Sequence, residues 1–70
     1  MEVWIGGNKV PVASFKEASQ KWRAYRDEEG IGASGMVRHD GDIVQGGKVV
    51  ARVSYNGRVW DKADNEIIVK

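Results

Sequence analysis

The chain has 70 residues, of which 41% are hydrophobic and 30% are charged, a composition typical of a folded globule rather than of a disordered or membrane-spanning chain. Eleven Lys and Arg against ten Asp and Glu give a net charge of +1, too balanced for the strong phosphate attraction that drives non-specific nucleic-acid binding. The absence of cysteine excludes a disulfide framework and a thiolate zinc site. We expect a single small domain over residues 1–70.

Location is indicated by the first residues and by the hydropathy pattern. Glu2 stands where a signal peptide needs basic residues, and the first apolar run ends at Gly6 and Gly7. Nowhere do about 18 consecutive apolar residues occur, so the sequence predicts no transmembrane helix. We therefore expect a cytoplasmic protein.

Residues 2–14 have the alternation of a β-hairpin. Gly7 and Asn8 accept positive φ angles and are the expected two-residue turn. This turn would place Ile5 opposite Val10 and Val3 opposite Val12, with all four side chains in the core.

Trp4 is expected on the other face of this hairpin, beside Pro11. Because proline cannot donate a hydrogen bond to a neighbouring strand, Pro11 marks its strand as an edge of the sheet. Trp4 is then either covered by a second layer or exposed as an anchor for a partner, and the sequence leaves both alternatives open.

A helix is predicted from Phe15 to Glu29. Ser14 and Glu17 have the spacing of a capping box, and Gly30 is the expected C-terminal cap. The apolar side chains recur at three- and four-residue steps, which predicts one buried stripe. That stripe consists of Phe15, Ala18, Trp22 and Tyr25.

The helix is expected to end on three acidic residues, Asp27, Glu28 and Glu29. Negative charge at a helix C-terminus is unfavourable because of the helix dipole. Such an exception indicates either an interaction surface or a solvated last turn.

The segment from Gly30 to Gly47 contains six glycines and little periodicity. Two apolar pairs interrupt it, Met36-Val37 and Ile43-Val44, which could form a strand and an anchored loop. The path of this segment is not predicted further.

A second hairpin is predicted around Asn56-Gly57, the strongest short signal for a two-residue turn. That turn would place Val53 opposite Trp60 and Arg52 opposite Asp61. One face, directed at the helix, would then consist of Val49, Ala51, Val53, Tyr55 and Trp60. A last strand is expected over residues 66–69.

The predicted fold is therefore an α+β domain in which one helix packs on one face of an antiparallel sheet. The element order is β-β-α-(β)-β-β-β, where the bracketed strand belongs to the glycine-rich segment. In this arrangement Trp22 and Trp60 are expected to fill the core between helix and sheet.

Two sequence patterns suggest a ligand-binding or catalytic site, but neither is accompanied by the neighbouring residues or elements that such a site requires. The run Gly30 to Gly35 matches G-x-G-x-x-G, but it follows a helix instead of a strand, so a cap and a tight turn are favoured over phosphate binding. His39 has only Asp40 and Asp42 nearby in sequence, too few ligands for zinc, and nothing places it next to a serine nucleophile such as Ser34 or Ser54. We expect no catalytic residue, no metal and no cofactor.

Basic residues of the helix and of the second hairpin suggest a different activity. Arg23 and Arg26 share a helix face, although the acidic residues that follow weaken their field. The remaining cations of this group are Lys16, Lys21, Arg38, Arg52 and Arg58. They make nucleic-acid binding an alternative function.

Three stretches resemble a set of small bacterial proteins of unknown function that are often associated with mobile elements. These stretches are residues 12–19, the turn Gly30-Ile31-Gly32-Ala33-Ser34 and the run Val50-Ala51-Arg52-Val53-Ser54-Tyr55-Asn56-Gly57-Arg58-Val59-Trp60. The resemblance spans residues 12–60 and implies a shared fold. It implies no activity and transfers no functional residue, and residues 61–70 exceed its pattern.

We expect a non-catalytic protein-binding module or a small accessory or inhibitory factor, encoded on a mobile element or phage. An inhibitor of a host defence complex, such as an anti-CRISPR protein, belongs to this class, although no residue singles it out. The alternatives are a small nucleic-acid-binding protein and a structural domain that dimerises through Trp4 or through the edge of the last strand. The residues expected to contact a partner are Trp4, Arg23, Asp27, Glu28, Arg52 and Arg58.

Overall fold

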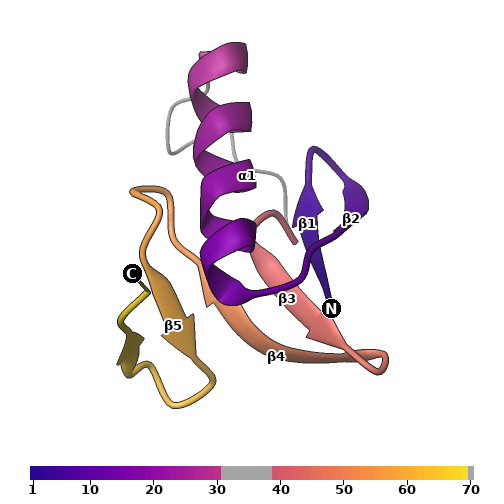
Figure 1. Ribbon diagram of the computed structural model, residues 1–70, viewed down its shortest axis with the longest axis vertical. Helices are drawn as coiled ribbons and strands as arrows, with labels where there is room; N and C mark the ends of the chain where they lie inside the picture. Colours follow the sequence, from indigo (N-terminus) through magenta and orange to yellow (C-terminus); the bar gives the residue numbers. More distant parts are fainter. Residues whose placement is uncertain (31–38, 70) are drawn as a thin grey trace.

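The computed structural model describes residues 1–30 and 39–69, and one helix lies across one face of a sheet (Figure 1). The elements are β1 (Glu2–Ile5), β2 (Asn8–Pro11), α1 (Phe15–Glu29), β3 (Asp42–Gln45), β4 (Lys48–Val53), β5 (Val59–Asp61) and β6 (Glu66–Ile67). The six strands form one sheet in the order β2-β1-β3-β4-β5-β6, with every neighbouring pair antiparallel. The predicted α+β class with one helix on one sheet face is confirmed.

The helix α1 begins and ends where the capping residues predict. The hydroxyl of Ser14 accepts the Glu17 N–H at 3.1 Å, and the Glu17 carboxylate accepts the N–H of Ala13 rather than that of Ser14. Gly30 has a φ of 65° and donates its N–H to the carbonyl of Arg26, which closes the helix. Of the predicted stripe, Ala18 and Trp22 are buried, while Phe15 and Tyr25 are half-buried.

The turn of the first hairpin is formed by Gly6 and Gly7, not by Gly7 and Asn8 as predicted. Its φ angles of 60° and 83° are both positive, which glycine adopts without strain. The observed pairs are Ile5 with Asn8 and Val3 with Val10. Because the register moves by two residues, no side chain changes face, and the strand with Pro11 is an edge of the sheet as predicted.

Burial in this hairpin is graded. Val3 and Val12 are buried, as predicted, whereas Ile5 and Val10 are half-buried at the margin of the core. The N–H of Val12 donates to the carbonyl of Met1 at 2.9 Å, which extends the pairing beyond the strand ends.

The second hairpin has a three-residue loop, so its predicted register is wrong. The Gly57 N–H donates to the Ser54 carbonyl at 2.8 Å, and the Ser54 N–H donates to the Arg58 carbonyl at 2.8 Å. Gly57 has a φ of 89°, as a tight turn followed by a left-handed residue requires. Val53 therefore pairs with Val59, and Arg52 pairs with Trp60.

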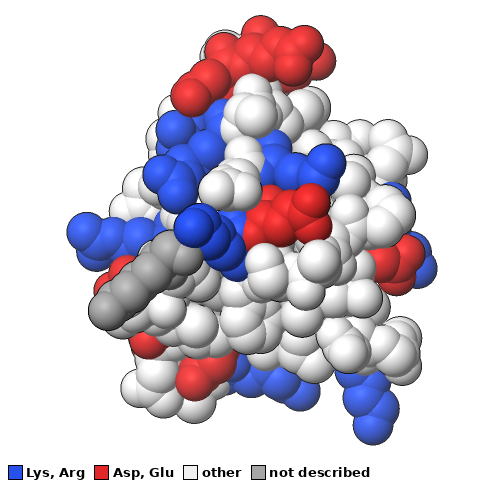
Figure 2. Space-filling model, in the orientation of Figure 1, with Lys and Arg blue, Asp and Glu red and all other residues white. Residues whose placement is uncertain are grey.

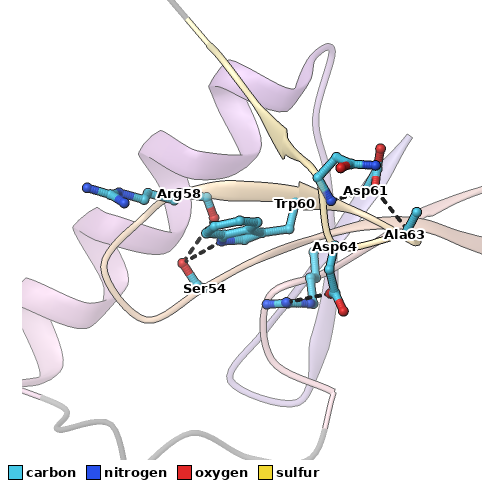
Figure 3. Close-up of polar contacts among 8 residues, drawn as sticks. Ser54, Arg58, Trp60, Asp61, Ala63 and Asp64 are labelled. Carbon is cyan, nitrogen blue, oxygen red and sulfur yellow. Dashed lines mark hydrogen bonds and ion pairs between the residues drawn. The ribbon is translucent and has the colours of Figure 1, made fainter.

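This one-residue shift exchanges the two faces of β5. Val59 points to the helix and is fully buried, whereas Trp60 is half-buried on the opposite face, so its predicted place in the core is wrong. The predicted Arg52–Asp61 pair is also absent. Asp61 instead accepts the N–H groups of Ala63 and Asn65, at 2.8 and 2.9 Å (Figure 3).

The helix explains why the loop has three residues. The Ser19 hydroxyl donates to the Gly57 carbonyl at 2.6 Å, and the Trp22 indole N–H donates to the Tyr55 carbonyl at 3.2 Å. Arg26 donates to the same carbonyl at 2.8 Å. In this conformation the loop carbonyls have donors from the helix, and local turn preference contains no information about these long-range hydrogen bonds.

A bulge between β3 and β4 produces another correction. Ile43 pairs with Ala51 and Val44 with Val49, so the register skips Val50. Val49, predicted on the helix side, consequently lies on the other face and is 42% exposed.

Gly41 allows β3 to enter between β1 and β4. Its N–H donates to the Trp4 carbonyl at 2.8 Å, and its carbonyl accepts the Val53 N–H at 2.7 Å. A Cβ at this position would overlap the Val53 carbonyl oxygen, and φ is 90°, so only glycine fits without strain. The predicted anchor at Ile43-Val44 is thus a strand, while Met36-Val37 lies outside the described residues.

The core lies between α1 and the sheet. Its buried hydrophobic residues are Val3, Val12, Ala18, Trp22, Ile43, Ala51, Val53 and Val59. The last strand, β6, has two residues instead of the predicted four, which leaves Ile68 68% exposed. In the described parts of the chain, α1 is too short and too polar to cross a bilayer.

We expect Ser19→Ala to lower the free energy of unfolding by about 1–3 kcal/mol, because the buried Gly57 carbonyl would lose its donor. Urea denaturation measures this change. The neighbouring exposed substitution Gln20→Ala is the control and should change stability by less than about 0.5 kcal/mol. Equal stability of Ser19→Ala and the wild type would contradict this role of the hydroxyl.

Candidate protein-binding surface

The sheet face opposite α1 carries one side chain from each strand in a single line, which we call the transverse row. Cross-strand pairing joins Trp4 to Lys9, Arg52 to both Asp42 and Trp60, and Trp60 to Glu66. Continuing the β1–β3 register places Trp4 beside Asp42. In sheet order the row is Lys9, Trp4, Asp42, Arg52, Trp60 and Glu66.

Alternation along the strands places this row away from the helix. The chain neighbours of its members, Val3, Ile43, Val53 and Val59, are buried in the core. Since successive side chains of a strand point to opposite faces, the row lies on the face that α1 does not cover.

Each tryptophan of the row has a cation over its ring. The Lys9 ammonium lies 5.7 Å from the Trp4 ring centre, and the Arg52 guanidinium lies 5.8 Å from the Trp60 ring centre. Such pairs attract the cation through the ring quadrupole and also hold the ring in place. Both indoles are half-buried, so each presents apolar surface to solvent.

The position of Trp4 lies between the two alternatives left open by the sequence. The His39 ring packs on it with centroids 5.6 Å apart, and His39 Nδ1 lies 3.5 Å from the Asp42 carboxylate. His39 thus covers part of Trp4 and does not bury it.

Trp60 is oriented by hydrogen bonds within the second hairpin (Figure 3). Its indole N–H donates to the Ser54 hydroxyl at 3.2 Å, and this hydroxyl lies 3.2 Å from the Arg58 carbonyl. Arg52, whose guanidinium lies over this ring, forms an ion pair with Asp64 at 2.9 Å. The indole is therefore fixed as a rigid platform.

Two open hollows flank Arg52 on this face. One, of about 350 Å³, is lined by Arg52, Ser54, Tyr55, Asn56 and Trp60. The other, of about 220 Å³, includes Val49, Asp42 and Asp64 in its lining. An aromatic platform beside an exposed valine and several charges resembles the centre of a protein interface more than a closed ligand site.

Chemical groups of the described residues do not gather into a reactive centre. No three His, Asp or Glu side chains within residues 1–30 and 39–69 are arranged to hold a metal ion. In the same residues every buried polar side-chain atom has a hydrogen-bond partner. Of the serines considered as nucleophiles, Ser54 holds Trp60 and Ser34 lies outside the described residues.

The structure distributes the six predicted partner residues over three places. Trp4 and Arg52 belong to the transverse row. Arg23 and Arg58 line a hollow of about 200 Å³ together with Ile68 and with Glu66 of the row, at the β5–β6 end of the sheet. Asp27 and Glu28 are exposed in the last turn of α1, and Figure 2 shows acidic side chains gathered at that end of the helix.

Sequence reasoning missed four members of the row: Lys9, Asp42, Trp60 and Glu66. Trp60 was assigned to the core because the Asn-Gly signal implied a two-residue turn. The two β5 residues Val59 and Trp60 are both apolar, so either could face the helix, and only the register distinguishes them.

Comparisons of the chain with models of protein families, with curated proteins and with solved structures find no match in any of the three. The resemblance to small bacterial proteins stays a prediction.

We expect acrylamide to quench the fluorescence of Trp4 and Trp60 but not that of Trp22, which is fully buried. The test uses Trp4→Phe and Trp60→Phe, alone and combined. Each single variant should keep a quenchable component, and the combined variant should lose it. Strong quenching of the combined variant, with its fold verified by circular dichroism, would contradict the assigned faces of β1 and β5.

Proposed function

We propose that the protein is a non-catalytic protein-binding module that uses the sheet face opposite α1. The observation that carries this proposal is the transverse row, in which two oriented, half-buried indoles each lie under a cation. Tryptophan and arginine are the residue types most enriched among interface hot spots, because they combine large apolar area with polar anchoring.

Charge on this face favours a protein partner over phosphate. The row contains two cations, Lys9 and Arg52, and two anions, Asp42 and Glu66. Arg52 is also paired with Asp64, which reduces its attraction for an anion. A surface with alternating positive and negative charges favours a protein surface of complementary charge. It does not attract the phosphates of a nucleic acid strongly.

Apolar area next to the row supports the same proposal. Val49 is 42% exposed and lies on this face because of the bulge in β4. The indoles and Val49 offer a discontinuous apolar surface, and the charged side chains between them would form the polar contacts of an interface. An accessory or inhibitory role in the cytoplasm, encoded on a mobile element, is part of this proposal.

We expect Trp60→Ala and Trp4→Ala to abolish capture of a partner protein from an extract of the host cell. The readout is mass spectrometry of proteins retained by the immobilised wild type and variants. Lys21→Ala, an exposed change on the helix, is the matched control and should retain the partner. Capture of the same proteins by the wild type and by both tryptophan variants would contradict this function.

A second candidate function, nucleic-acid binding, is supported by cations on the helix side. Figure 2 shows Lys and Arg side chains gathered over α1, with the acidic end of the helix above them. The Arg23 side chain packs against Gly57, next to Arg58, so the helix and the second hairpin contribute to one basic area. Glu66 lies 3.9 Å from Arg58 and weakens this area.

If these cations bind phosphate, affinity for a DNA or RNA oligonucleotide should fall steeply with salt, and Arg23→Ala and Arg58→Ala should each reduce the salt slope by about 1. Fluorescence anisotropy at two salt concentrations measures both effects. Arg52→Ala on the opposite face is the control. No binding at low salt would eliminate this candidate.

A further inference from the structure

The charges of the transverse row are antisymmetric about its centre. From β2 to β6 the row is cation, Trp, anion, cation, Trp, anion. Read from β6 to β2, it is anion, Trp, cation, anion, Trp, cation. Each charge of the row therefore has the opposite charge at the mirrored position, and each Trp has the other Trp.

Two copies of the chain related by a two-fold axis would place these opposite charges against each other. If the axis lies in the interface, parallel to the strands and between β3 and β4, each strand faces its mirrored strand in a second copy. Lys9 then faces the second copy's Glu66, Trp4 faces its Trp60, and Asp42 faces its Arg52. All pairs between the two rows are of opposite sign, as a self-complementary interface requires. Within one chain Asp42 also lies against His39, Arg52 against Asp64 and Glu66 against Arg58, so these three side chains would share or exchange partners in the dimer.

The next line of side chains on this face agrees with the same axis. Val44 and Val49 are directly paired across β3 and β4 and lie on the face away from the helix. The axis passes between them. Because Val44 is only 6% exposed, the apolar contact would come mainly from the Val49 side chains of the two copies, which lie beside the axis. This contact would cover the 42% exposed Val49 side chain with apolar surface.

We propose that the occupant of this face is a second copy of the chain, stacked sheet on sheet with the two helices outside. This inference rests on the proposed protein-binding function and names its partner. The strands of the two sheets would run nearly parallel, about 10 Å apart, as in aligned sheet packing. An axis perpendicular to the strands would instead place each charge against its own copy, which is repulsive.

The sheet edges are poorer candidates for self-association. At one edge, Pro11 of β2 lacks the N–H that an added strand would need. At the other edge, β6 has only two residues, Glu66 and Ile67, so few backbone hydrogen bonds could form.

The area of the sheet face limits how tightly two copies could bind. Six strands at spacings of about 4.8 Å span about 24 Å, which limits the interface to the low end of specific contacts. We expect a concentration-dependent dimer with a Kd on the order of 10–100 μM.

Lys9 and Glu66 provide a sharp test because they occupy opposite edges of the sheet. Within one chain they lie on the two edge strands of the sheet, β2 and β6, and do not contact each other, so any coupling between them must arise between copies. Both residues are exposed, and the ion pair of Glu66 with Arg58 at 3.9 Å is a surface pair that contributes little stability, so both substitutions should leave the fold intact.

The experiment measures self-association of the wild type, Lys9→Glu and Glu66→Lys by sedimentation equilibrium up to about 1 mM, with circular dichroism as the folding check. Each single variant places like charges against each other and should raise the dimer Kd at least about tenfold. An equimolar mixture of the two variants should restore dimers, as should both changes in one chain, because opposite charges face each other again.

Two outcomes would overturn the inference. The first is a wild type that stays monomeric up to about 1 mM. The second is a wild-type dimer whose Kd is unchanged in the single variants or is not restored in their mixture, because it would use another surface. If the wild type is monomeric and the tryptophan variants still lose a captured protein, the binding function holds with a different partner.

Discussion

Hydrogen bonds from α1 to the carbonyls of the second hairpin loop are the constraint on which the rest of the structure depends. Ser19 donates to Gly57, and Trp22 and Arg26 both donate to Tyr55. Because buried carbonyls need donors, these bonds hold the loop at three residues. The loop length then determines the register of β5, and the register determines which of its side chains enter the core.

The surface of the protein follows from that register. With Val59 in the core, Trp60 lies on the open face in line with Arg52 and Glu66. The same side chain would have been buried under the helix with a loop one residue shorter. The hydrogen bonds from α1 to the loop thus stabilise the core and also place Trp60 in the transverse row. The proposed protein binding and self-association both depend on this placement.

Much of the fold could be predicted because its signals are local. The helix bounds follow from Ser14, Glu17 and Gly30, whose capping hydrogen bonds form within one turn of the chain. The edge position of β2 follows from Pro11, which lacks a donor. The exposed row could not be predicted, since it joins residues from six strands and depends on every register between them.

The sequence by itself determined the α+β class, the helix and its buried stripe, and the absence of cysteine chemistry, because periodicity, capping and composition act over a few residues. Only the tertiary structure decided the loop length at Asn56-Gly57, the bulge that exposes Val49 and the place of β3 beside β1. Each of these depends on contacts between residues distant in the chain, such as Gly41 with Trp4 and Ser19 with Gly57. A local turn preference does not include such long-range contacts, and so the faces of the sheet are assigned by packing.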